Sequence, residues 1–315
     1  MTLYLTQEET QESNNCYTHI KGDKDLSFLE STKIIDSAWE DIKTLRIGGT
    51  QSIKSSEFKQ IFDYIMYKEY NEKNKPILVL ETDLLLSEDL MSFLYEYIQN
   101  KMLFSLYITI PKLEEDWKRN LFIKNLDAFY SILPPESLAF NIDYNLEVPS
   151  KENIKFLYKK YPKIKEIFIH PITQKCIIKD VGYRPWLNKL HNSKVYTIAR
   201  VSWKMGKKVN FLCNILPCMF SYRQYKKLKI NTNTSVYCRN ETLNIFADGT
   251  LSLCPIFKDT KISIKNWTEL GFDYQEEINK ARSLPNICFY RCVDCKYHKM
   301  QLCNGPCHGC KGIKE

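Results

Sequence analysis

Hydrophobic residues in the first 220 positions follow two alternating patterns. Apolar runs of four or five residues alternate with longer stretches in which apolar residues recur at helical spacing. The short runs predict strands at residues 2–6, 44–47, 77–80, 106–110, 138–142 and 167–170. The longer stretches predict helices at residues 57–67, 88–98, 113–132 and 151–161.

This alternation of strands and helices predicts an α/β fold built from βαβ units, as a parallel sheet or barrel. Ser55 and Ser87 stand where helix N-caps are expected. About six units fit the pattern, fewer than the eight of a closed (β/α)8 barrel. We therefore expect a partial (β/α)6 barrel.

One joint between a predicted strand and the following helix contains Gly48, Gly49 and Thr50. Two glycines allow the backbone to turn sharply and to approach a ligand closely. The simpler interpretation is a plain strand-to-helix turn, which the glycines alone favour.

The net charge of +8 and the globular composition narrow the classes of protein only slightly. A solvated, mildly basic surface explains the charge, and attraction to an acidic peptide or nucleic acid is the alternative. The first residues show no signal peptide, and no run approaches the roughly 20 apolar residues of a membrane helix. We expect a cytoplasmic protein, in which clustered cysteines bind metal or do redox chemistry.

The twelve cysteines are unevenly distributed. Four lie in the first 230 residues, namely Cys16, Cys176, Cys213 and Cys218. The other eight are Cys238, Cys254, Cys288, Cys292, Cys295, Cys303, Cys307 and Cys310. This asymmetry predicts two domains, one of residues 1–225 and a cysteine-rich one of residues 226–315.

The spacing of the eight clustered cysteines indicates metal binding. Short C-x2-C and C-x3-C loops bring two thiolates to one centre at little entropic cost. Eight thiolates suffice for two four-thiolate sites, which favours iron–sulfur clusters, zinc or copper(I). In the zinc alternative, His298 and His308 are further candidate ligands. Asp248-Gly249 predicts a hairpin turn between the segments that lead to Cys238 and Cys254.

The order Cys238-x10-Gly249-x4-Cys254, followed by Cys292-x2-Cys295-x7-Cys303-x3-Cys307-x2-Cys310, resembles the SPASM domain of radical SAM enzymes that modify ribosomally made peptides. The spacing between Cys295 and Cys303 is seven residues, where five is usual. The resemblance implies two auxiliary 4Fe–4S clusters. One would be held by Cys238, Cys254 and Cys307, and the other by Cys292, Cys295, Cys303 and Cys310. The fourth ligand of the first cluster could be Cys288, Cys218 or Cys213, or this position could have no protein ligand.

The N-terminal part resembles a radical SAM barrel whose catalytic motif has decayed. Glu9, Ser13 and Cys16 stand in the register of the three cluster cysteines. Thr50 replaces the glutamate of the family's Gly-Gly-Glu joint, and residues 80–86 resemble the family's later strand and its Asn-Gly-Leu-Leu turn. Because the thiolates and the carboxylate are missing, the resemblance implies that this joint does not support cleavage of S-adenosylmethionine.

Cys288, Cys292 and Cys295 repeat the C-x3-C-x2-C spacing of a radical SAM cluster. A relocated catalytic cluster is one interpretation of this repeat. The SPASM pattern already uses the last two cysteines, and no barrel strand precedes them, so we favour the SPASM assignment.

The combination resembles the SPASM protein of grasp-with-spasm peptide-modification systems. That resemblance implies maturation of a precursor peptide together with an ATP-grasp ligase. Two alternatives stay open: a non-catalytic scaffold that presents the peptide to the ligase, and a zinc-stapled module that binds nucleic acid. No residue stands out in the sequence as a catalytic acid, base or nucleophile. His170 ends a predicted strand, where barrel active sites lie, but a lone histidine there is more often part of a polar rim.

Overall fold

The computed structural model describes most of the first 233 residues and short parts of the remainder. The described residues are 1–6, 25–71, 75–100, 104–111, 113–143, 149–170, 177–178, 182–183, 189–212, 215, 217–233, 244–247, 250–252, 262–263 and 299–300. None of the helices within these ranges is long and apolar enough to cross a bilayer.

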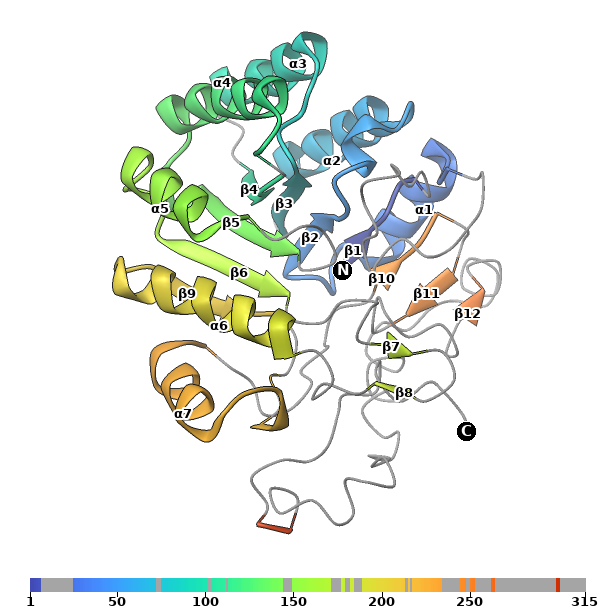
Figure 1. Ribbon diagram of the computed structural model, residues 1–315. Coiled ribbons are helices and arrows are strands. Elements are labelled where there is room, and N and C mark those ends of the chain that lie inside the picture. Colours follow the sequence, from blue (N-terminus) through green and yellow to red (C-terminus); the bar gives the residue numbers. More distant parts are fainter. Residues whose placement is uncertain are drawn as a thin grey trace.

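The described strands form one large curled sheet and a separate two-stranded sheet (Figure 1). The large sheet has the order β12-β11-β10-β1-β2-β3-β4-β5-β6-β9. Its strands are β1 (Thr2–Leu3), β2 (Thr44–Ile47), β3 (Ile77–Thr82), β4 (Ser105–Thr109), β5 (Leu138–Asp143), β6 (Glu166–His170), β9 (Lys208–Phe211), β10 (Asn244–Ile245), β11 (Thr250–Ser252) and β12 (Ile262–Ser263). The eight strands from β10 to β9 run parallel, whereas β11 and β12 are antiparallel to their neighbours. The small sheet pairs β7 (Ile177–Ile178) with β8 (Gly182–Tyr183).

Seven α-helices of the described part follow the strands and lie along the outer side of the curl (Figure 1). They are α1 (Phe28–Ala38), α2 (Phe58–Asn71), α3 (Glu88–Gln99), α4 (Asp116–Ile132), α5 (Lys151–Lys160), α6 (Lys189–Lys204) and α7 (Tyr222–Asn231). Short 3-10 turns are η1 (Ser52–Lys54), η2 (Pro135–Ser137) and η5 (Pro217–Met219). The sheet is thus an incomplete barrel with helices on its outer face.

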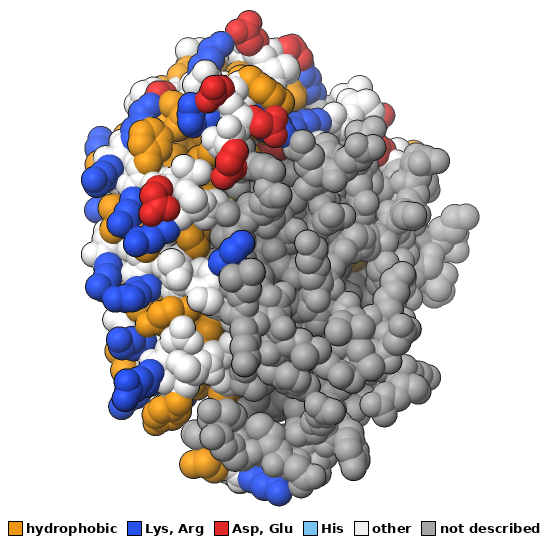
Figure 2. Space-filling model, viewed as in Figure 1, with side chains coloured by type: hydrophobic (Ala, Val, Ile, Leu, Met, Phe, Trp, Pro, Cys, Tyr) orange, Lys and Arg blue, Asp and Glu red, His pale blue; other side chains and the backbone are white. Residues whose placement is uncertain are grey.

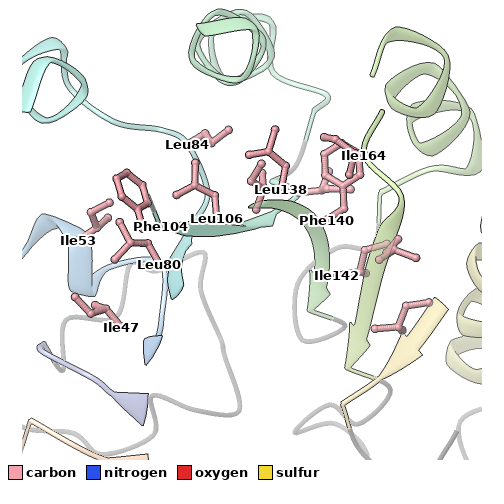
Figure 3. Close-up of a cluster of buried hydrophobic side chains, with 14 of the residues drawn as sticks. Ile47, Ile53, Leu80, Leu84, Phe104, Leu106, Leu138, Phe140, Ile142 and Ile164 are labelled. Carbon is pink, nitrogen blue, oxygen red and sulfur yellow. The ribbon is translucent and has the colours of Figure 1, made fainter. Parts of the chain in front are cut away.

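The hydrophobic core lies between the sheet and these helices. Alternate strand residues such as Leu80, Leu106 and Phe140 point toward the helices and are fully buried (Figure 3). Buried aromatic side chains on α2 and α4, among them Phe62 and Phe129, pack against them. Burying such side chains supplies most of the favourable free energy of folding.

The structure confirms the α/β class, the parallel sheet and the incomplete barrel. All six predicted strands and all four predicted helices are present. The parallel run is longer than the six strands expected. It gains β9, a short strand that the apolar pattern does not mark, and β10, which comes from the cysteine-rich part of the sequence.

The serines expected as helix N-caps differ in their hydrogen bonds. The Ser87 hydroxyl accepts a hydrogen bond from the Leu90 amide at 3.3 Å, which confirms the expected N-cap of α3. The Ser55 hydroxyl instead accepts from the Glu57 amide at 3.4 Å, before α2 begins. The predicted hairpin is confirmed by the antiparallel pairing of β10 with β11.

The predicted boundary between residues 225 and 226 falls inside α7, which packs against α6. Beyond that boundary, β10 pairs with β1 in parallel and extends the sheet of the first segment. The division of the chain into two domains stays a prediction, and any separation must leave this shared sheet intact.

Helix α1 begins with a capping box that the apolar pattern alone does not reveal. The Ser27 hydroxyl accepts from the Glu30 amide at 3.3 Å, and the Glu30 carboxylate accepts from the Ser27 amide at 3.1 Å. Such reciprocal bonds satisfy two amides that a bare helix end leaves unpaired.

We expect Ser27→Ala to lower the free energy of unfolding by about 1 kcal/mol, because this cap is lost. Ser37→Ala in the same helix is the matched control, since the exposed Ser37 hydroxyl only bonds back to the Ile34 carbonyl. Urea unfolding monitored by circular dichroism measures both. Equal effects of the two substitutions would show that the capping box does not stabilise α1.

Candidate functional site on the inner face of the sheet

The face of the sheet opposite the helices is unusually polar for a parallel sheet. Successive strand residues point to opposite faces, so the neighbours of the core residues Leu80, Leu106 and Phe140 face inward. Most parallel sheets are apolar on both faces. Here the inward positions of β2 to β6 include Arg46, Glu81, Tyr107, Thr109, Asn141 and Phe168.

Glu81 on β3 is the centre of this inner-face cluster. Its Oε2 atom accepts a hydrogen bond from the Gly49 amide at 3.1 Å and lies 3.1 Å from Arg46 Nη2. Its Oε1 atom accepts from Asn141 Nδ2 at 2.8 Å. The Glu81 side chain is only 10% exposed. Both carboxylate oxygens are therefore occupied by protein donors, so Glu81 links three parts of the sheet and is not poised as a general base.

An aromatic layer lies beside this carboxylate. The Arg46 guanidinium sits 4.9 Å from the centroid of the Tyr107 ring, and Tyr107 stacks on Phe168 with centroids 4.6 Å apart. Ala139 is the register partner of Tyr107 on the strand between them, and its small side chain leaves room for the stack. Burial raises the pKa of the Tyr107 hydroxyl, so the ring stays neutral at physiological pH.

Asn141 contributes the one amide of the cluster. Its Nδ2 atom donates to Glu81 and also to Thr109 Oγ1, at 3.1 Å. Its Oδ1 atom is buried and has no hydrogen-bond partner among the described residues. A buried acceptor without a donor costs about 1–3 kcal/mol, so a bound N–H or O–H group would be stabilised there.

Further along the inner face, the paired charged side chains are more exposed to solvent. Lys208 Nζ on β9 lies 2.5 Å from Glu166 Oε1 on β6, and Asn210 donates to the other Glu166 oxygen at 3.2 Å. Asn233 donates to Asn210 Oδ1 at 2.7 Å. Because Lys208 is more than half exposed, this pair contributes little to stability.

The predicted glycine joint lies directly against the cluster. Gly49 has φ +80°, a conformation that glycine adopts without strain, and its amide is the donor to Glu81. A Cβ atom on Gly48 would lie 2.4 Å from Thr2 Cγ2 and 3.0 Å from Tyr4 Cε1. Thr50 is buried. The glycines thus allow a sharp turn and a close approach to Tyr4, which favours the plain-turn interpretation.

The turn after β3 holds a leucine in a left-handed conformation. Leu84 has φ +56° and is fully buried. Its carbonyl accepts from Asn125 Nδ2 of α4 at 2.8 Å, and its amide donates to Thr82 Oγ1 at 3.0 Å. Non-glycine residues in this region cost of order 1–3 kcal/mol, and surrounding contacts must hold them there. The turn lies at the end of the strand that carries Glu81.

The predicted metal ligands fall outside the described residues. This applies to Cys238, Cys254, Cys288, Cys292, Cys295, Cys303, Cys307 and Cys310, and also to Cys213, His298 and His308. Glu9, Ser13 and Cys16 of the decayed motif lie outside them too. The backbone of Cys218 belongs to η5, and that of His170 ends β6 opposite Asp143, but their side chains are not among those described. Within the described ranges, no group of three His, Cys, Asp or Glu side chains could hold a metal ion.

The sequence predictions located the glycine joint but not the cluster beside it. Arg46, Glu81, Tyr107 and Asn141 were not among the candidate site residues. Arg46, Tyr107 and Asn141 each lie between two apolar residues, and Glu81 follows an apolar run, in strands of a parallel sheet, where both faces are expected to be apolar. This period-two polarity is the signal that could have identified the inner face.

Comparison with known proteins adds no family to this picture. No protein-family model matches the chain, and no curated protein matches it significantly.

Proposed function

We propose that the protein takes part in the maturation of a ribosomally made peptide, together with an ATP-grasp ligase, and carries two 4Fe–4S clusters in its cysteine-rich part. It does so without a cluster of its own that cleaves S-adenosylmethionine. The ligand sets are those that the SPASM resemblance implies, with Cys288 as a further candidate for the first cluster.

The polar inner face of the incomplete barrel is the observation that best supports a binding role. Asn141 Oδ1 is a buried acceptor without a donor among the described residues, next to the aromatic layer of Tyr107 and Phe168. A peptide supplies both an N–H donor and apolar side chains for such a surface. The inner face of the half-barrel is thus the place where we expect the precursor to bind.

The glycine joint supports the absence of S-adenosylmethionine cleavage. The Gly49 amide and both Glu81 oxygens are already hydrogen-bonded within the protein, and Thr50 supplies no carboxylate. The cofactor's amino group would have to displace Arg46 or Asn141 to reach Glu81. Breaking such buried polar pairs costs several kcal/mol.

The donor set of the cysteine-rich part fits two clusters. It offers eight thiolates, the ligands that iron–sulfur clusters require, and six of them form two groups of short spacing. The β10–β11 hairpin pairs Asn244 with Ser252, and these strands lead in sequence to Cys238 and Cys254. Bound clusters would supply one-electron transfer.

We expect anaerobically purified full-length protein to contain about eight iron and eight sulfide per chain. Cys254→Ala and Cys303→Ala, one in each proposed ligand set, should each lower the iron content by about half. Cys176→Ala is the matched control, because Cys176 lies outside the pattern, and should leave the content unchanged. Stoichiometric zinc without absorbance near about 400 nm would instead support the zinc-stapled nucleic-acid module.

The non-catalytic scaffold is the second candidate, and the occupied oxygens of Glu81 favour it. Redox titration of the purified protein separates it from a catalytic role. If the clusters cannot be reduced reversibly at physiological potentials, a catalytic role through them is excluded and the scaffold function is favoured.

A further inference from the structure

The positive charge of the chain is concentrated in one segment. Residues 151–233 contain 19 Lys and Arg but only 3 Asp and Glu, which gives this segment a net charge of +16. Because the whole chain carries +8, the remaining residues carry −8. No acidic residue occurs anywhere between Asp180 and Glu241. The moderate net charge of the whole chain is therefore the sum of one strongly basic segment and an acidic remainder.

The structure gathers this charge on the side of the molecule formed by α5, α6 and α7. These helices are packed side by side, α6 against both others, and Lys and Arg side chains line that side in Figure 2. Twelve exposed residues define the basic face: Lys151, Lys155, Lys159, Lys163, Lys165, Lys194, Arg200, Lys204, Arg223, Lys226, Lys227 and Lys229. None of the twelve forms an ion pair with another described residue.

Like charges that form no ion pair within the described part of the chain repel one another, which disfavours the folded state. Ordinary surfaces mix both signs, and a surface of one sign concentrates partners of the opposite sign. We infer that the basic face of α5, α6 and α7 is a docking surface for an acidic polypeptide segment with interspersed apolar side chains. This inference rests on the charge distribution and goes beyond the proposed cluster chemistry.

Two observations favour a polypeptide over a nucleic acid. Ten of the twelve basic residues are lysine, whereas arginine is the residue best suited to bidentate phosphate and base recognition. Exposed apolar side chains also stand among the charges, namely Phe156, Tyr222 and Ile230, which are 48%, 63% and 71% exposed. Ile230 has no ring on which a base could stack, but it can pack against an apolar side chain of a peptide.

The test uses the full-length protein and two fluorescein-labelled peptides, one of five Glu-Glu-Leu repeats and one of fifteen glutamates. Fluorescence anisotropy at about 0.1 M salt measures their binding. The variant Lys155→Glu, Lys204→Glu, Lys227→Glu changes one exposed residue on each helix. We expect it to weaken binding of the Glu-Glu-Leu peptide by about tenfold or more.

The matched control is Lys33→Glu, Lys43→Glu, Lys75→Glu, which changes the net charge equally at exposed positions outside the basic face. It should alter the affinity by less than about threefold. Ile230→Ser should weaken binding of the Glu-Glu-Leu peptide but not of the glutamate peptide. Circular dichroism checks that every variant is folded.

Three results would overturn the inference. They are absence of peptide binding, equal weakening by the two triple variants, and tighter binding of a 20-nucleotide oligo-dT than of either peptide. The last result would identify the basic face as a nucleic-acid surface. Because none of these measurements depends on iron content, they are independent of the cluster test.

Discussion

Replacing Glu81 with alanine is expected to lower the free energy of unfolding by about 3 kcal/mol or more. The substitution removes the buried carboxylate that lies 3.1 Å from Arg46 Nη2. It also removes the acceptor of the Gly49 amide and of Asn141 Nδ2, so two further donors lose a hydrogen bond. Urea unfolding followed by tryptophan fluorescence measures the loss.

Two comparisons show whether burial is the cause. Asp89→Ala removes a carboxylate that pairs with Lys59 at 2.6 Å but is 77% exposed, so it should cost less than about 1 kcal/mol. The double variant Arg46→Met, Glu81→Ala removes both members of the contact between Arg46 and Glu81, so its cost should be smaller than the sum of the two single changes. A Glu81 effect as small as that of Asp89 would contradict the central role of this carboxylate.

Because Leu84 has a left-handed backbone conformation, we expect its glycine variant to be more stable than its alanine variant, the reverse of the order usual in a strand. Leu84→Ala should cost about 3 kcal/mol, because it leaves a cavity under α4. Leu84→Gly should be more stable than Leu84→Ala by about 1 kcal/mol, since glycine adopts φ +56° without strain. The same unfolding experiment compares them.

Leu106 provides the matched pair for this prediction. It is also fully buried but lies in the ordinary extended strand β4. There the glycine variant should be less stable than the alanine variant by about 0.5–1 kcal/mol. If both positions gave the ordinary order, Leu84 would not be held in a left-handed conformation in solution.

The strands and helices that the sequence predicted correctly are those with strong local patterns. Strand β3 follows from the apolar run at residues 77–80, and α3 from the Ser87 cap and the leucines that follow it. Helix α1 was not predicted, because the sequence feature that marks it is the capping pair Ser27 and Glu30 and not a long apolar stripe. Strand β9 (Lys208–Phe211) begins with a lysine and has an asparagine at its third position, so no apolar run marks it.

The inner-face cluster depends on contacts between strands, which local patterns do not contain. Glu81 and Asn141 are 60 residues apart, and their hydrogen bond depends on the register of β3, β4 and β5. The glycine joint was predictable because φ +80° at Gly49 is a local requirement. That its amide would donate to Glu81 required the pairing of β2 with β3.

The pairing of β10 with β1 has a consequence for synthesis of the chain. Thr2 pairs with Asn244, so the first strand acquires this neighbour only after more than 240 further residues have been made. At 5–20 residues per second, that interval lasts roughly 10–50 s. Throughout it, one edge of β1 stays unpaired on the nascent chain and is open to wrong partners. The cysteine-rich part thus sets the time at which the earliest strand of the sheet is covered, and chaperone dependence during translation is the expected result.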